Sequence, residues 1–202
     1  MRFALAVLSL AALGGCLAAA PLGLDDWAGL DAPGRQEVAV RVLAESDVTA
    51  LSRELYALPA PTRAAPVIVG GFVPGRVPGR RTELVVVGTA LGGPSASALL
   101  DAATAIAARA RYGQAPERTV LVALWPHGAG PADVLALPLW PASQRRAVLW
   151  VGADGPPSGT PDAAPPERVD LPAALPRAEA SARLQARILR AATVPDTTGR
   201  TP

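Results

Sequence analysis

Two residue types that often form functional sites, cysteine and histidine, each occur only once in this chain. Among the 202 residues there is a single cysteine, Cys16, and a single histidine, His127. One cysteine excludes a disulfide framework and any zinc cluster built from cysteines. One histidine excludes almost every metal site that uses several histidines. A functional site in this protein must therefore rely on carboxylates, hydroxyls, arginines or this one histidine.

Cys16 ends an amino-terminal segment that matches a bacterial lipoprotein signal. An arginine near the start is followed by an uncharged apolar run over residues 3–13, and Leu13, Gly14 and Gly15 precede the cysteine. The apolar run is too short to cross a bilayer, which needs about 20 helical residues. We expect residues 1–15 to be a signal peptide and Cys16 to become an acylated amino terminus. The alternative is an ordinary secretory signal in which Cys16 has no role.

Acylation at Cys16 implies an exported protein that is anchored to a membrane at the cell envelope. Two or three acyl chains hold a protein at a bilayer stably, whereas one does not. Leu17 follows the cysteine, rather than the aspartate that keeps many lipoproteins of Gram-negative bacteria in the inner membrane. In such a bacterium we expect the periplasmic side of the outer membrane. A formal net charge of +2 without an extended basic run excludes nucleic acid as a partner.

Continuous aliphatic runs bounded by turn residues predict buried β-strands. The runs cover residues 67–69, 84–87, 118–125 and 147–151. We expect the chain to turn at residues 70–76 and to form a loop at residues 88–93, because both segments are rich in glycine.

Apolar residues at helical spacing predict three helical segments, at residues 36–58, 95–112 and 178–192. The first is expected to divide in two near Ser46 or Asp47. Ser95 or Ser97 is the expected N-cap of the second, and neither lies in the G-x-S-x-G pattern of a serine nucleophile. Residues 129–143 predict at most one helical turn, and residues 155–176 are rich in proline and predict a loop.

Strands that alternate with helices predict an α/β fold with an open, mostly parallel sheet and flanking helices. The expected organisation has six parts: a signal peptide over residues 1–15, a lipid-anchored tether over 16–35, an α/β core over 36–155, a proline-rich loop over 156–176, a helix packed on the core over 177–193, and a disordered tail over 194–202.

Four segments in sequence order resemble the di-zinc exopeptidases of metallopeptidase family 28. VIVGGFVPGR at residues 67–76 resembles a hairpin of that family, and ELVVVG at 83–88 resembles the strand that opens its metal site. ALLDAATAIA at 98–107 resembles the next helix, and RTVLVALW at 118–125 resembles a later strand. The resemblance covers about residues 66–155. It implies a zinc-exopeptidase-like fold, truncated at its carboxyl end, with the site at the carboxyl ends of the strands.

The same resemblance implies a di-zinc site, and this sequence departs from it at the ligand positions. In the family, two histidines, two aspartates and a glutamate hold the metals, and a second glutamate accepts a proton from the bridging water. Alanine and glycine offer no side-chain ligand, and one histidine falls short of the three protein ligands of a catalytic zinc. We therefore expect neither zinc nor another cofactor. The matching positions hold Ala90, Gly92, His127, Gly128 and Gly152.

The sequence predicts a catalytically inactive peptidase-like lipoprotein that binds a ligand, a protein partner or an active paralogue in the bacterial envelope. One alternative is a hydrolase or peptidase with a non-standard site around His127 and Asp154. A simpler interpretation makes His127 a partly exposed loop residue. Another alternative is a degraded gene product without function. Because a truncated sheet exposes an edge and an apolar face, we expect the helix at residues 178–192 or a partner to cover it.

Overall fold

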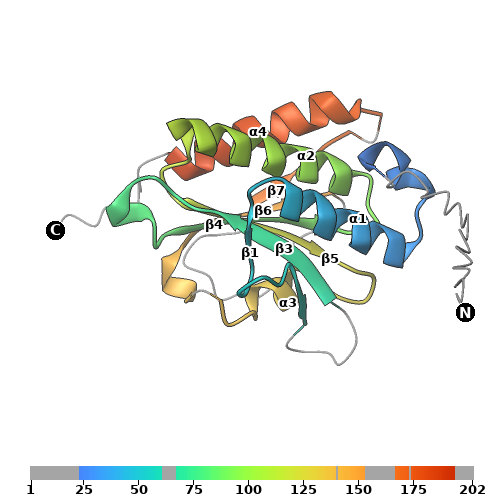
Figure 1. The fold of residues 1–202 in the computed structure, drawn as a ribbon, viewed down its shortest axis with the longest axis horizontal. Coiled ribbons are helices and arrows are strands. Elements are labelled where there is room, and N and C mark those ends of the chain that lie inside the picture. Colours follow the sequence, from blue (N-terminus) through green and yellow to red (C-terminus); the bar gives the residue numbers. More distant parts are fainter. Residues whose placement is uncertain (1–22, 61–66, 140, 153–166, 173, 194–202) are drawn as a thin grey trace, which may run out of the picture.

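The computed structural model describes residues 23–60, 67–139, 141–152, 167–172 and 174–193. A seven-stranded sheet organises these residues, in the order β1-β3-β5-β4-β6-β7, with β2 also paired to β3 (Figure 1). The strands are β1 (Thr49–Ala50), β2 (Ala57–Pro59), β3 (Val67–Val73), β4 (Leu84–Ala90), β5 (Thr119–Trp125), β6 (Arg145–Val151) and β7 (Glu167–Val169). The α-helices are α1 (Ala32–Glu45), α2 (Ser95–Arg109), α3 (Pro131–Leu135) and α4 (Arg177–Thr193). Short helical turns are η1 (Leu24–Gly29), η2 (Pro78–Arg80), η3 (Ala110–Gln114) and η4 (Ala142–Gln144).

The centre of the sheet is parallel and buried. β4 pairs in parallel with β5 on one side and with β6 on the other, so that Val86 lies opposite both Leu121 and Val148. Strands buried on both faces need continuous aliphatic sequences, which is what β4 and β5 have. β7 adds to β6 in parallel, while β3 runs antiparallel to β5. The predicted α/β class, with an open sheet of mixed but mostly parallel strands and flanking helices, is confirmed.

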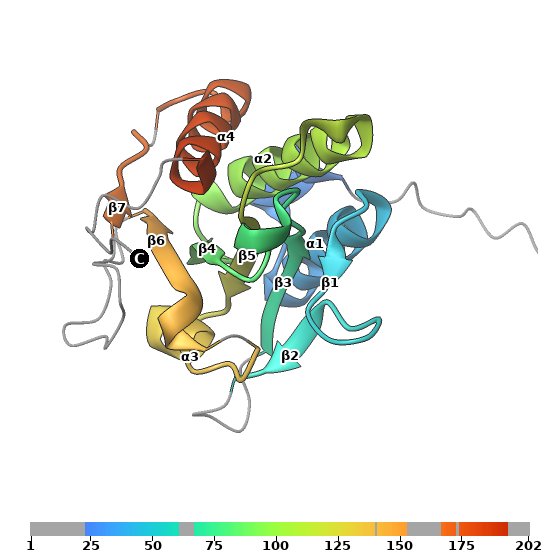
Figure 2. The ribbon, with the colours of Figure 1, turned by 90° about the vertical axis from the view of Figure 1, so that its left-hand side faces the viewer.

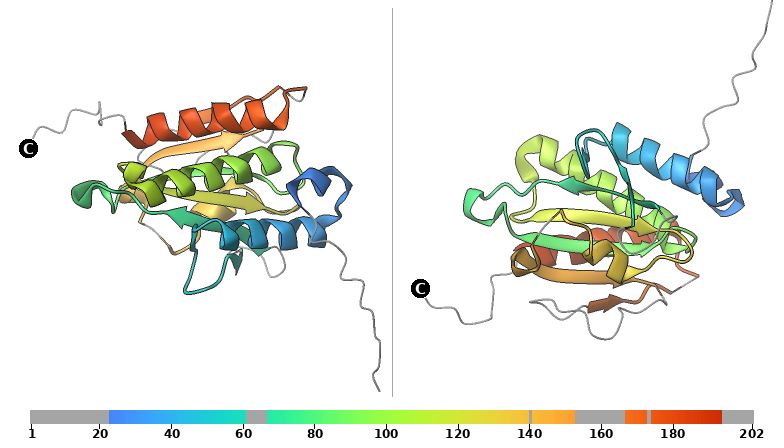
Figure 3. Two further views of the ribbon diagram at one scale, coloured as in Figure 1. Left: turned by 45° about the horizontal axis from the view of Figure 1, so that its top comes forward. Right: turned by 90° about the horizontal axis from the view of Figure 1, so that it is seen from below.

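Three helices cover one face of the sheet. α1, α2 and α4 lie side by side, with α2 between the other two, whereas α3 lies on the opposite face (Figures 2 and 3). The large apolar core under the three helices includes Leu43 of α1, Leu99 and Ile106 of α2, and Leu184 and Ile188 of α4, all fully buried. α4 therefore covers apolar surface of the sheet and of α2.

The opposite face carries a smaller apolar core centred on two tryptophans. The rings of Trp125 and Trp150 meet edge to face, with centroids 5.4 Å apart and an interplanar angle of 82°. Gly88 lies beneath them on the middle strand, where a Cβ atom would come within 2.6 Å of the Trp125 ring and 2.9 Å of the Trp150 ring. Val134 and Leu135 of α3 belong to the same core. A glycine at this point lets the two indoles meet over the sheet.

A charged network joins the amino ends of the three central strands. Glu83, just before β4, accepts a hydrogen bond from Nε of Arg118 at 2.6 Å and forms an ion pair with Arg146, whose Nε lies 3.1 Å from the carboxylate. Arg118 also donates to the carbonyl of Ala191 in α4, at 3.2 Å. Burial alone would raise the pKa of Glu83, but the hydrogen bonds and charges of the two arginines outweigh it and lower the pKa. The network therefore ties the sheet to α4.

The helix predicted over residues 36–58 is wrong in its second half. α1 begins earlier, at Ala32, and ends at Glu45, after which the chain forms the short edge strands β1 and β2. Asp47 and Arg53 adopt positive φ angles of 55° and 49°, which reverse the chain where a helix would continue. Leu51 is buried but Leu55 is 57% exposed. The apolar residues at helical spacing thus point in different directions on an irregular edge.

Both glycine-rich turns are predicted too early, because β3 and β4 continue through their glycines. β3 extends through Gly70 and Gly71 to Val73, and β4 extends through Gly88 to Ala90. A Cβ on Gly70 would lie 2.2 Å from the carbonyl oxygen of Val122, so this glycine allows close packing against the neighbouring strand. Glycine here marks a close approach of backbones within the sheet rather than a turn.

Three further boundaries differ from the sequence predictions. The N-cap of α2 is Pro94, and both Ser95 and Ser97 lie inside the first turn of the helix. β7 forms within the segment predicted as the loop 156–176 because it pairs with β6. The predicted tether over 16–35 overlaps η1 and the start of α1, and Trp27 of η1 is buried in the large core.

Several predictions concern residues outside the described part of the chain: the signal peptide over 1–15, Cys16, Asp154 and the tail over 194–202. Within the described residues, no helix is both long enough and apolar enough to span a membrane.

Candidate functional site

The carboxyl ends of β4, β5 and β6 meet at one edge of the sheet, which we call the strand-end edge. Parallel pairing places Ala90 opposite Trp125, and Thr89 opposite Val151. This is the edge at which open α/β sheets form ligand sites. Ala90 is the last residue of β4, and the other positions predicted to replace metal ligands follow the strand ends: Gly92, His127, Gly128 and Gly152.

The polar groups nearest the strand ends are used by the fold itself. The Thr89 hydroxyl is buried and donates to the carbonyl of Val151 at 2.8 Å. The N–H of Leu91 donates to the carbonyl of Trp125 at 2.7 Å. Gly152 takes a positive φ of 106° directly after β6, a conformation that favours glycine. These contacts position the strand ends. Ala90, Gly92 and Gly152 themselves carry no carboxylate or imidazole.

His127 lies in the turn that follows β5. The turn is closed by a 3.1 Å hydrogen bond from the N–H of Ala129 to the carbonyl of Pro126, and Gly128 has a positive φ of 87°. The His127 side chain is exposed and makes no hydrogen bond or ion pair with any other described residue. Its predicted partner Asp154 lies outside the described residues, so their pairing stays a prediction.

The residues at the strand-end edge do not fit the di-zinc centre that the family resemblance implies. Such a centre needs several nitrogen and oxygen ligands within bonding distance of each metal. Ala90, Gly92, Gly128 and Gly152 have no side-chain donor atoms. Across the parts of the chain that the structure describes, no group of three or more histidine, cysteine, aspartate or glutamate residues could hold a metal ion.

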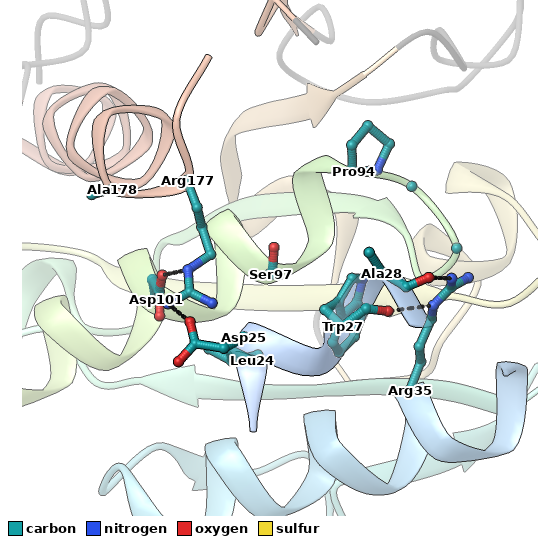
Figure 4. Close-up of a pocket in the computed structure, with 12 residues that line it drawn as sticks. Leu24, Asp25, Trp27, Ala28, Arg35, Pro94, Ser97, Asp101, Arg177 and Ala178 are labelled. Atoms are coloured by element: carbon teal, nitrogen blue, oxygen red, sulfur yellow. Dashed lines mark hydrogen bonds and ion pairs between the residues drawn. The ribbon is translucent and has the colours of Figure 1, made fainter. Parts of the chain in front are cut away.

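A pocket of about 680 Å³ opens beside the strand-end edge, between η1, α1 and the amino ends of α2 and α4 (Figure 4). Gly92, Gly93 and Pro94, in the loop from β4 to α2, form part of its wall. The pocket therefore begins where β4 ends. Its larger and polar side chains are Asp25, Trp27, Arg35, Ser97, Asp101 and Arg177.

One end of the pocket is built around a shared ion pair. Arg177 of α4 contacts Asp25 of η1 at 2.8 Å through Nη2, and Asp101 of α2 at 2.9 Å through Nε. Burial raises the pKa of the Asp101 carboxyl; the charge of Arg177 opposes this effect and that of Asp25 adds to it. This cluster joins three elements that are far apart in the sequence.

Arg35 of α1 lies at the other end of the pocket, held by backbone groups of η1. Its Nε donates to the carbonyl of Trp27 at 3.2 Å, and its Nη2 donates to the carbonyl of Ala28 at 3.3 Å. The Nη1 atom faces the loop after β4, since a Cβ on Gly92 would lie 3.6 Å from it. The guanidinium is therefore oriented by two carbonyls, and its third nitrogen remains beside the pocket.

Sequence reasoning missed this pocket. Asp25 and Arg35 fall in the segment predicted to be a tether, and Asp101 and Arg177 lie in segments that the sequence predicts only as helices. The closeness of Asp25 and Arg35 in the sequence is too weak a signal to specify a site.

A comparison of the chain with models of known protein families finds no match, and a search of curated proteins finds no similar sequence.

Proposed function

We propose that this protein is a catalytically inactive, lipid-anchored binding protein of the bacterial envelope, built on a truncated zinc-exopeptidase-like scaffold. The observation that carries the proposal is the contrast between two neighbouring regions. The strand-end edge has Ala90, Gly92 and Gly152 where the resemblance implies metal ligands. The adjoining pocket keeps two arginines, two aspartates and a serine. Polar side chains in the pocket, next to an edge that lacks metal ligands, support a role in binding a ligand or a partner rather than in catalysis.

The sequence of the amino terminus supports the anchoring part of this proposal. Cys16 follows the small residues that lipoprotein signal peptidase requires, and the described domain starts at Gly23. Fully extended, the chain between these two residues reaches at most about 25 Å. An acylated Cys16 would therefore hold the pocket close to the bilayer surface. A partner in this position is a membrane lipid, a small molecule of the envelope or another envelope protein, such as an active paralogue.

The inactive part is tested by assaying the full chain, purified in detergent, with an aminoacyl p-nitroanilide. We expect release of nitroaniline at the uncatalysed rate with and without added zinc, because the strand-end edge offers too few ligands to activate a water molecule. Zinc-dependent turnover that a chelator abolishes would contradict the proposal. Turnover that is lost in His127→Ala would instead support a hydrolase with a non-standard site at His127.

The anchoring part is tested by labelling bacterial cells with radioactive palmitate while they produce the wild-type chain or Cys16→Ala. We expect label on the wild-type protein only, and release of Cys16→Ala from the membrane fraction. Equal labelling of both chains, or none of either, would rule out a lipoprotein anchored at this residue.

A further inference from the structure

We propose that the pocket binds the oxyanion of a small molecule, a carboxylate or a phosphate, between Arg35 and the amino end of α2. The inference rests on the proposed binding role and adds the chemical class of the ligand. Three features of the described residues carry it: the positive end of a helix that no side chain caps, an arginine oriented beside it, and a serine in the pocket wall whose hydroxyl makes no hydrogen bond with a described residue.

The first feature is the amino end of α2. A helix of 15 residues carries partial positive charge at its amino end, where the first N–H groups have no partner within the helix. In α2 the N-cap is Pro94, no side chain caps the helix, and the first turn contains no acidic residue. The N–H of Ala96 donates to the carbonyl of Gly93 at 3.2 Å, but no side chain balances the charge of this helix end, and an anion bound there would do so.

The second feature is Arg35, which brings a full positive charge to the same end of the pocket. Within the described residues its guanidinium makes no ion pair, and its hydrogen bonds go only to the neutral carbonyls of Trp27 and Ala28. The two carboxylates of the pocket, Asp25 and Asp101, are both bound to Arg177. The negative charge of the pocket thus lies at the Arg177 end and does not neutralise Arg35.

The third feature is Ser97, which is independent of the helix charge. The residue is only 7% exposed, lines the pocket, and stands between Asp101 and Pro94 in the close-up (Figure 4). Its hydroxyl makes no hydrogen bond with any other residue that the structure describes. Because the rest of Ser97 is buried, its hydroxyl is held at the pocket wall, where a ligand that accepts a hydrogen bond would give it a partner.

The loop after β4 leaves room for the ligand. Gly92 and Gly93 form the wall beside Arg35, and a side chain on Gly92 would begin 3.6 Å from the guanidinium. The pocket volume of about 680 Å³ is within the range of small-molecule sites. An oxyanion can come from a soluble metabolite or from a lipid headgroup, and the pocket chemistry is the same for both.

The test measures binding of inorganic phosphate and of acetate to the full chain in nonionic detergent by isothermal titration calorimetry. We expect saturable binding of at least one anion. Arg35→Gln and Ser97→Ala should each weaken it, by about 10-fold or more for the arginine, because hydrogen bonds to charged groups are the stronger ones. Arg183→Gln is the matched control, because its side chain is 56% exposed on α4 and lies outside the pocket. Thermal unfolding of each variant verifies that it is folded.

Absence of saturable binding for both anions, or equal affinity of Arg35→Gln and the wild type, would overturn the inference. Sedimentation with vesicles of phosphatidylglycerol or of phosphatidylcholine, using Cys16→Ala to remove the anchor, then distinguishes the sources. Arg35-dependent binding to the anionic vesicles identifies a headgroup, whereas binding of free anions alone identifies a soluble ligand. Peptidase turnover in a protein that still binds anions would contradict the proposed function and leave this inference standing.

Discussion

Replacing Glu83 by glutamine tests whether the charged network at the amino ends of the central strands stabilises the fold. The Glu83 side chain is 18% exposed and that of Arg118 is 4% exposed, so the pair is largely removed from water. The substitution keeps the size of the side chain and removes its charge. It therefore leaves Arg118 and Arg146 facing an amide where a carboxylate had balanced them.

The size of the effect follows from burial and from the groups that remain. Removing one charge of a fully buried pair costs about 3–5 kcal/mol of unfolding free energy. Because Glu83 is partly solvated and glutamine keeps one hydrogen-bond acceptor, we expect a loss of about 2–3 kcal/mol at pH 7. For a chain of this length, that corresponds to a decrease in Tm of roughly 5–10 °C.

The pH dependence gives the sign of the effect. The pKa of Glu83 is lower in the folded protein than in the unfolded chain, so its ionised form stabilises the fold above the unfolded pKa of about 4.3. That stabilisation is lost as the pH falls through the lower, folded pKa. The difference between wild type and Glu83→Gln should thus be complete at pH 7 and shrink below about pH 4.

Urea unfolding followed by circular dichroism at pH 7 and at pH 3 measures both quantities. Glu179→Gln is the control, because Glu179 forms an exposed pair with Arg183 on α4, with side chains 51% and 56% exposed. Its loss should be at most about 0.5 kcal/mol. A Glu83→Gln loss no larger than that of the control at pH 7, or one that grows as the pH falls, would mean that the ionised Glu83 does not stabilise the fold.

Two further substitutions test the two cores. Leu184→Ala should destabilise the protein by about 2–5 kcal/mol in urea unfolding, because Leu184 of α4 is fully buried against α2 and the sheet. Leu189→Ala, on the same helix but only partly buried, should cost clearly less, and equal losses would mean that α4 does not pack as described. Gly88→Ala should cost about 1–3 kcal/mol and reduce the near-ultraviolet circular dichroism signal, since its Cβ would push Trp125 and Trp150 apart. An unchanged near-ultraviolet spectrum would show that the indoles do not meet over this glycine.

The central strands could be predicted from the sequence because their environment leaves a strong pattern. Strands of a parallel sheet are covered on both faces, so β4 and β5 must be aliphatic throughout, and turn residues bound them. α4 could be predicted equally well, because Ala180, Leu184 and Ile188 form a single buried stripe opposite exposed arginines.

The edge strands and the glycines within strands could not be predicted, because their local sequences indicate a helix and turns. The leucines near residue 55 recur at helical spacing, and only pairing with β3 makes β1 and β2 favourable. From the sequence alone, Gly70 and Gly88 resemble turn residues. Only the structure shows that a side chain on Gly70 would collide with a carbonyl group of the next strand, and one on Gly88 with two indole rings. The pocket is a product of tertiary structure, since Arg35, Ser97 and Arg177 come from three separate segments.

The absence of a di-zinc site is tested most directly by the zinc content of the full chain after incubation with excess zinc and removal of the free metal. We expect far less than one zinc ion per chain by elemental analysis, because glycine and alanine stand where the family resemblance implies metal ligands. Two zinc ions retained by each chain would contradict this expectation.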